Sequence, residues 1–135
     1  MCLALYLFTD ENVKERKFDN ENPRMWIQKE RDVSTWAADN RNVYYIGSSQ
    51  KCGCGWRRWY EWDDDDTEKL EKQKDRESLF KLLAGLNLKN SHLIICWMGD
   101  EGKVERKEIL DITQLKDITF DLEECVDYKL KYDII

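Results

Sequence analysis

Apolar residues occur in short runs separated by polar segments, and most runs have the length of a β-strand. Residues 2–9 are almost continuously apolar, which predicts a central strand covered on both faces. Residues 43–48 are β-branched and aromatic, with turn-forming residues on either side, and they predict a second buried strand. A further apolar run over residues 91–98 predicts a third, and residues 25–28 predict a short one.

The remaining strand signals lie in the second half of the chain. The turn residues 99–102 separate the apolar run 91–98 from a charged stretch over residues 104–110, so we expect these two segments to form a hairpin with an exposed second strand. Residues 111–115 predict a single helical turn. Residues 126–134 alternate between apolar and charged side chains, which predicts a strand with one face in water.

One segment has the spacing of a helix, over residues 67–86. Its leucines recur at the spacing of one helix face, at Leu79, Leu82, Leu83 and Leu86. The four consecutive aspartates at 63–66 precede it, and negative charge suits the positive end of a helix dipole. The first half of the segment has little apolar face, so we expect its mixed charges to form a solvated surface.

Together these elements predict an α+β fold, with a mixed or antiparallel sheet of about five strands packed by one main helix. The regular βαβ alternation of a doubly wound fold is missing. No internal repeat or linker-like composition divides the chain, so we expect a single domain over residues 1–135.

The charge and cysteine content narrow the classes of partner and compartment. The formal net charge is −6, which disfavours nucleic acid and anionic membranes, since both are bound through lysine and arginine. No apolar run is long enough to span a bilayer. The five cysteines, an odd number without a signal peptide, fit a reducing compartment, so we expect a cytoplasmic protein.

The most unusual chemistry lies in the loop Cys52-Gly53-Cys54-Gly55-Trp56, which follows the strand at 43–48. Thiolates bind soft metals and act as nucleophiles, and the flanking glycines allow a tight turn. A redox site is one interpretation, because Lys51, Arg57 and Arg58 would favour thiolates. A disulfide between Cys52 and Cys54 would close a small, strained ring.

Metal binding is a second interpretation, with zinc as the candidate ion, but the two loop thiols need further ligands. Cys2, His92 and Cys96 are the candidates for these ligands. A cysteine hydrolase would need His92 as its base, since it is the chain's single histidine. In the third interpretation the loop has no chemistry and merely turns Trp56 into the core. No catalytic residue is assigned by the sequence.

The aromatic segment 56–62 supports an alternative function. It contains three tryptophans, one tyrosine and two arginines, a mixture that is common at protein interfaces. The chain could therefore be a non-enzymatic interaction module that docks a protein partner through this segment. The aspartates at 63–66 lack the spacing and glycine of a calcium loop. The oligomeric state has no signal in the sequence.

The strand Tyr44-Tyr45-Ile46-Gly47-Ser48 and the loop that follows it also carry a resemblance. With Met1-Cys2 before the first strand, they resemble a family of small uncharacterised bacterial proteins that have a Tyr-Tyr-x-Gly-Ser strand and a Cys-Gly-Cys-Gly-aromatic loop. The resemblance implies a bacterial, cytosolic protein and imports no mechanism. It also implies that Cys2, Cys52 and Cys54 belong together, because all three fall in the matching segments.

Overall fold

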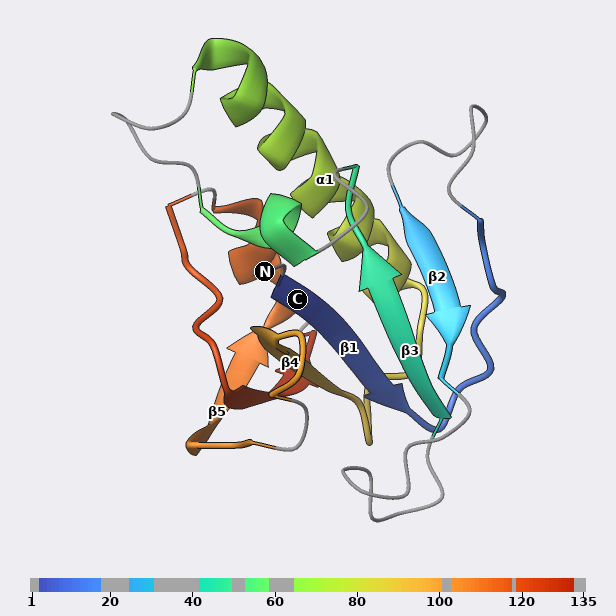
Figure 1. Ribbon diagram of the computed structural model, residues 1–135. Coiled ribbons are helices and arrows are strands. Elements are labelled where there is room, and N and C mark those ends of the chain that lie inside the picture. Colours follow the sequence, from blue (N-terminus) through green and yellow to red (C-terminus); the bar gives the residue numbers. More distant parts are fainter. Residues whose placement is uncertain are drawn as a thin grey trace.

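The computed structural model describes residues 3–17, 25–30, 42–49, 53–58, 65–100, 103–117 and 119–132. Its described strands form one six-stranded sheet in the order β2-β3-β1-β4-β6-β5 (Figure 1). The sheet is mixed, because five strands pair antiparallel and β5 runs parallel to β6. The predicted α+β fold is confirmed, with one strand more than expected.

The central strand is β1 (Leu3–Thr9), which pairs with β3 (Asn42–Gly47) on one side and β4 (His92–Trp97) on the other. All seven residues of β1 are buried, as its uninterrupted apolar run predicts. The short strand β2 (Trp26–Lys29) lies beside β3 at one edge. At the opposite edge, β6 (Val126–Lys131) lies between β4 and the edge strand β5 (Arg106–Asp111).

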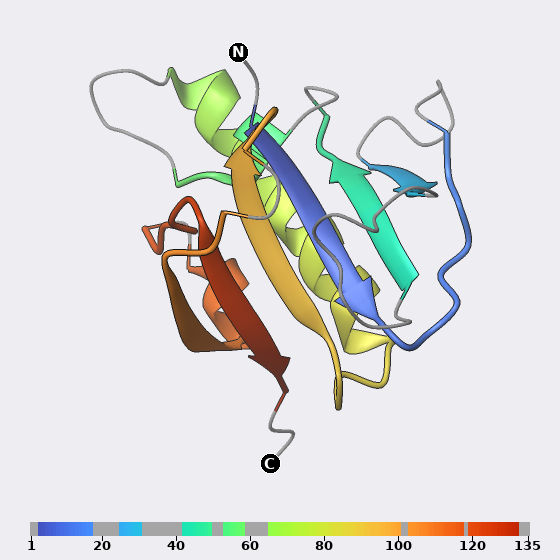
Figure 2. The same cartoon turned by 60° about the horizontal axis from the view of Figure 1, so that its bottom comes forward.

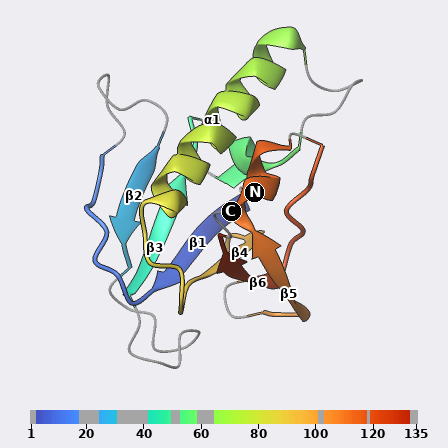
Figure 3. The same ribbon diagram turned by 180° about the vertical axis from the view of Figure 1, so that it is seen from behind.

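Helix α1 (Asp66–Ala84) lies across one face of the sheet (Figures 2 and 3). It begins where the Asp65 side chain accepts a hydrogen bond from the Glu68 amide at 2.8 Å, and it ends at Gly85. The single-turn helix η2 (Ile112–Lys116), where a helical turn was predicted, packs against α1. No helix of the described residues is long and apolar enough to cross a membrane.

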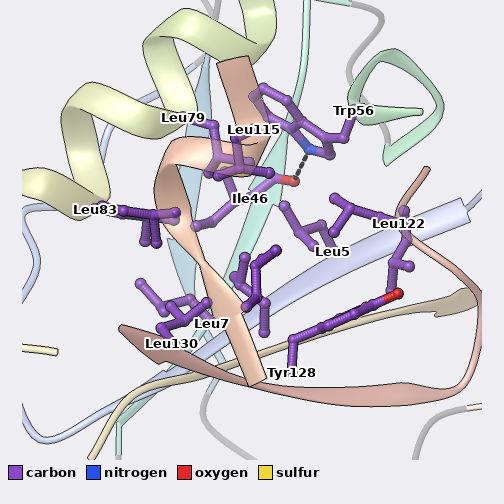
Figure 4. Close-up of a cluster of buried hydrophobic side chains, with 14 of the residues drawn as sticks. Leu5, Leu7, Ile46, Trp56, Leu79, Leu83, Leu115, Leu122, Tyr128 and Leu130 are labelled. Carbon is purple, nitrogen blue, oxygen red and sulfur yellow. Dashed lines mark hydrogen bonds between the residues drawn. The ribbon is translucent and has the colours of Figure 1, made fainter. Parts of the chain in front are cut away.

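Buried side chains fill both faces of the central strands. The inner core lies between the sheet and α1, and Figure 4 shows its leucines from β1, α1, η2 and β6. The outer cluster lies on the opposite face and is built mainly from aromatic residues and two cysteines: Ala4, Tyr6, Phe8, Val43, Tyr45, Cys96 and Cys125. Alternation along each strand divides the residues between the two faces, so Leu5 and Leu7 are inner while Tyr6 and Phe8 are outer.

The predicted hairpin of residues 91–98 and 104–110 is wrong. β4 and β5 are separated by β6, which pairs antiparallel with β4 and parallel with β5. The physical reason is burial. β6 contributes Val126, Tyr128 and Leu130 to the inner core, whereas β5 has four exposed residues and contributes Leu110. The strand with more apolar surface therefore takes the interior position.

The prediction that the first half of α1 is a solvated surface is also wrong in part. The side chains of Lys72, Asp75 and Arg76 are buried, and Arg76 is only 1% exposed. They continue the helix face of Leu79 and Leu83 toward the N-terminus of α1, where polar loops cover them. Buried charge in a helix requires partners. These partners lie around the loop Cys52-Gly53-Cys54-Gly55-Trp56, which is called the glycine-cysteine loop below.

Candidate functional site

The glycine-cysteine loop forms the single-turn helix η1 (Gly53–Trp56), which packs against β1 and α1. Both glycines lie where a side chain would collide. A Cβ added to Gly53 would lie 3.0 Å from the Leu3 carbonyl oxygen, and one added to Gly55 would lie 2.4 Å from Ser48 Oγ. The glycines are therefore needed for close approach of the loop backbone to the sheet.

Trp56 fixes the end of this loop in the inner core. Its side chain is 0% exposed, and its Nε1 donates a hydrogen bond to the Ile46 carbonyl oxygen at 3.0 Å. Figure 4 shows the ring among leucines of α1, η2 and β1, with this hydrogen bond dashed. The loop thus does turn Trp56 into the core, as one of the interpretations of the sequence predicts.

Helix α1 contacts the loop through Asp75, whose side chain has no exposed surface. Ser49 Oγ donates a hydrogen bond to Asp75 Oδ2 at 2.6 Å, and the same oxygen would lie 2.8 Å from a Cβ on Gly55. One turn earlier, Lys72 Nζ donates to the Arg58 carbonyl oxygen at 3.3 Å. Helix α1 is therefore joined by hydrogen bonds to the segment after β3, through Asp75, and to the segment after η1, through Lys72.

Arg76 donates hydrogen bonds to three backbone carbonyl oxygens around the site. Its Nε donates to the Trp56 carbonyl oxygen at 2.9 Å and its Nη1 to that of Asp117 at 3.0 Å, while its Nη2 donates to that of Phe120. Burial lowers the pKa of Arg76 to about 10, although the charges of Asp121 and Asp117 oppose this effect. The guanidinium therefore stays charged at neutral pH and clamps η1 to the segment after η2.

Arg57 lies on the outside of this clamp and forms a two-point ion pair with Asp121. The distances are 2.8 Å from Nε to Oδ1 and 2.9 Å from Nη2 to Oδ2. Burial acts to raise the pKa of Asp121, but the hydrogen bonds and charge of Arg57 outweigh it and hold the pKa below its usual value. Of the three positive charges that were predicted to favour a loop thiolate, that of Arg57 is thus already paired with a carboxylate.

The structure places the candidate thiols in different environments. Cys54 is half-buried and packs against the inner core. Cys96 is buried in the outer cluster, on the other side of the sheet. Cys2, Cys52 and Lys51 lie outside the described residues.

His92 lies far from the loop. It pairs with Phe8, five residues along β1 from Leu3, which is about 16 Å along the strand. Its Nδ1 is 2.7 Å from Asp127 Oδ1. The structure therefore brings neither His92 nor Cys96 to the loop. Among the described residues, no three metal-ligating side chains converge.

No protein-family model, no curated protein and no solved structure matches the chain. The resemblance of its strand and loop to a bacterial family therefore stays a prediction.

Sequence reasoning missed four polar residues that hold the loop, two of them buried (Asp75 and Arg76) and two half-buried (Ser49 and Asp121). The burial of Asp75 and Arg76, which lie in α1, could have been predicted from their spacing. Asp75 and Arg76 precede Leu79 by four and three positions, so they share its helix face. The other two had no such signal, because contacts between Ser49 and Asp75 or Arg57 and Asp121 join segments distant in sequence.

We expect Gly55→Ala to lower the free energy of unfolding by about 1–3 kcal/mol, because the added Cβ overlaps Ser48 and Asp75. Urea denaturation of the purified variant measures the change. Gly85→Ala is the matched control. Gly85 has a φ of −85°, and a Cβ added there would make only ordinary van der Waals contacts, the nearest at 3.6 Å to the Leu82 carbonyl oxygen, so Gly85→Ala should change stability by less than about 0.5 kcal/mol. Equal effects of the two substitutions would contradict the close packing of the loop.

Proposed function

We propose that the protein is a small thiol–disulfide exchange protein whose reactive thiols are Cys52 and Cys54 of the loop, with Cys2 as their partner. The observation that supports this is the contact between Gly53 and the start of β1, where a Cβ would reach within 3.0 Å of the Leu3 carbonyl oxygen. Cys2 is bonded to Leu3, and Cys52 and Cys54 are bonded to Gly53. Consecutive Cα atoms are about 3.8 Å apart. Each of the three cysteines is therefore a direct chain neighbour of one of the two residues, Leu3 and Gly53, that make this contact.

The rigidity of the loop supports exchange over a passive role. Gly53, Gly55 and Trp56 fix η1 against β1, Asp75 and the inner core, so Cys54 within η1 is held in place relative to β1. Cys54 is half-buried, so the residue is partly open to solvent. A fixed and accessible thiol next to a second one favours intramolecular disulfide formation, because little chain entropy is lost.

The proposed reaction is exchange with a low-molecular-weight disulfide. A loop thiolate attacks one sulfur of this disulfide, a mixed disulfide forms, and the first small thiol leaves after taking up a proton. The Cys2 thiolate then attacks the loop sulfur, and the second small thiol leaves. The protein is oxidised to one internal disulfide while the small disulfide is reduced to two thiols. Cys2 is the favoured partner because a bond between Cys52 and Cys54 would be strained.

The alternative of an interaction module rests on fewer residues than the sequence indicated. Trp56 is buried in the inner core, so it offers no surface to a partner, and Arg57 is engaged by Asp121. Trp59 and Trp62 lie outside the described residues. A thiol-bound metal ion such as zinc is the second alternative, and the same experiment tests it.

The experiment uses the Cys96→Ser/Cys125→Ser variant, in which only Cys2, Cys52 and Cys54 remain. We expect oxidised glutathione to give a monomer that has lost two hydrogen atoms, with peptide mapping linking Cys2 to Cys52 or Cys54. Cys2→Ser in the same background should stop this reaction at the mixed disulfide. Elemental analysis for zinc runs in parallel. Native thiols that stay unreactive, or that are blocked by a stoichiometric metal ion, would contradict the proposal.

A further inference from the structure

A second pair of thiols lies away from the loop, on the face of the sheet opposite α1. Cys96 is in β4, and Cys125 directly precedes β6. Both side chains belong to the outer cluster, with exposed fractions of 1% and 9%. Within that cluster, Cys96 is the only buried member from β4, and Cys125 is the only one beyond β4. Cys125 therefore joins the cluster through β4, next to Cys96.

The backbone brings these two residues within disulfide range. The Cys125 amide donates a hydrogen bond to the Ile95 carbonyl oxygen at 2.9 Å. That carbonyl belongs to the peptide bond leading into Cys96, so the Cα atoms of Cys96 and Cys125 are about 5–6 Å apart, within the range that disulfides span.

The local pairing agrees with this placement. β4 and β6 pair Leu93 with Tyr128 and Ile94 with Asp127, and the Cys125 amide bonds to Ile95 one residue out of this register, which places Cys125 beside the Ile95–Cys96 peptide bond. Cys125 has a φ of 60°, the one positive value among the described non-glycine residues. Such a residue at the end of an antiparallel ladder is typical of a β-bulge.

We propose that Cys96 and Cys125 are a second redox site, which a low-molecular-weight disulfide converts to a cross-strand disulfide between β4 and β6. Cys125 attacks first, because it has the larger exposed fraction. Its thiolate takes one sulfur of the oxidant and releases one small thiol. The Cys96 thiolate then displaces the second small thiol, so the two cysteines are oxidised and the oxidant is reduced to two thiols.

The surroundings of Cys125 should make its thiol–disulfide exchange slower than that of an exposed cysteine. Burial raises the pKa of Cys125 above its usual value, and the charges of Glu105, Asp100 and Glu124 act in the same direction, against a small opposing effect of Lys103. Cys125 is therefore mostly a thiol at neutral pH. The rate of disulfide formation rises with pH as its thiolate fraction grows, and it is still rising at pH 9.

The experiment uses the Cys2→Ser/Cys52→Ser/Cys54→Ser variant, in which only Cys96 and Cys125 remain. Incubation with oxidised glutathione should yield a monomer that has lost two hydrogen atoms, with a single Cys96–Cys125 peptide link. The link closes a long loop of chain, so oxidation should raise the Tm by roughly 5–10 °C, and a dithiol reductant should reverse the rise.

Three outcomes would overturn the proposal: thiols that persist after prolonged oxidation above pH 9, links only between molecules, or a Tm that does not rise on oxidation. Peptide mapping of the oxidised wild-type protein repeats the test should the triple variant not fold. Cys96→Ser in the triple-variant background is the matched control. Its reaction with oxidised glutathione should stop at a mixed disulfide on Cys125. This site shares no thiol with the loop, so the two proposals stand or fall separately.

Discussion

Trp56→Ala is expected to lower the free energy of unfolding by about 3–5 kcal/mol, among the largest effects of any single substitution in this chain. The indole is completely buried in the inner core, so its removal leaves a cavity as well as lost contacts. The Ile46 carbonyl oxygen also loses the hydrogen bond from Nε1. Urea denaturation followed by circular dichroism measures the change.

Trp56→Phe is the matched control for this prediction. Phenylalanine keeps most of the apolar contact but removes the donor to Ile46 and leaves a smaller cavity, so its cost should be clearly less than that of alanine. A loss below about 1 kcal/mol for Trp56→Ala would show that the indole is not a core residue. Trp56 would then be available again to the proposed interaction module.

Arg76→Met is expected to cost on the order of 3–5 kcal/mol of unfolding free energy. Methionine is apolar and of similar length, yet it offers no donor to the carbonyl oxygens of Trp56, Asp117 and Phe120. These three groups would stay buried or partly buried without their partner, and each such group carries a desolvation cost. Guanidinium chloride denaturation measures the loss.

Lys74→Met is the control on the same helix. Lys74 is exposed, so this substitution should change stability by less than about 0.5 kcal/mol. Arg76→Lys tests geometry against charge, since an ammonium group cannot reach three carbonyl oxygens with the planar fork of a guanidinium. A lysine variant as stable as the wild type would mean that charge, and not the three-point clamp, holds the segment after η2.

The strands and the main helix could be predicted from sequence because their signals are local. β1 is a continuous apolar run, β6 alternates with period two, and α1 has leucines at helical spacing. The pairing of strands is not local. The turn after β4 indicated a hairpin with β5, and only the competition for burial between Leu110 and the three apolar residues of β6 decides otherwise.

The candidate site was predictable to a smaller extent. The sequence identified the loop and the burial of Trp56 as one of its interpretations, because glycines and a tryptophan after a strand are recognisable. It assigned the charges of α1 to solvent, since nothing in the sequence shows that a distant segment covers Arg76. It likewise assigned Arg57 to the thiols, when Asp121, 64 residues away, pairs with it.

The strand order β4-β6-β5 has a consequence for the way the sheet opens and closes. Within the described sheet β5 is joined only to β6, so any fluctuation that releases β6 also releases β5, whereas β5 can fray alone. Amide hydrogen exchange should therefore rank β5 as the least protected of these three strands and β4 as the most protected. A covalent link between Cys96 and Cys125 would slow exchange in β6 and, through it, limit the openings of β5 to local fraying.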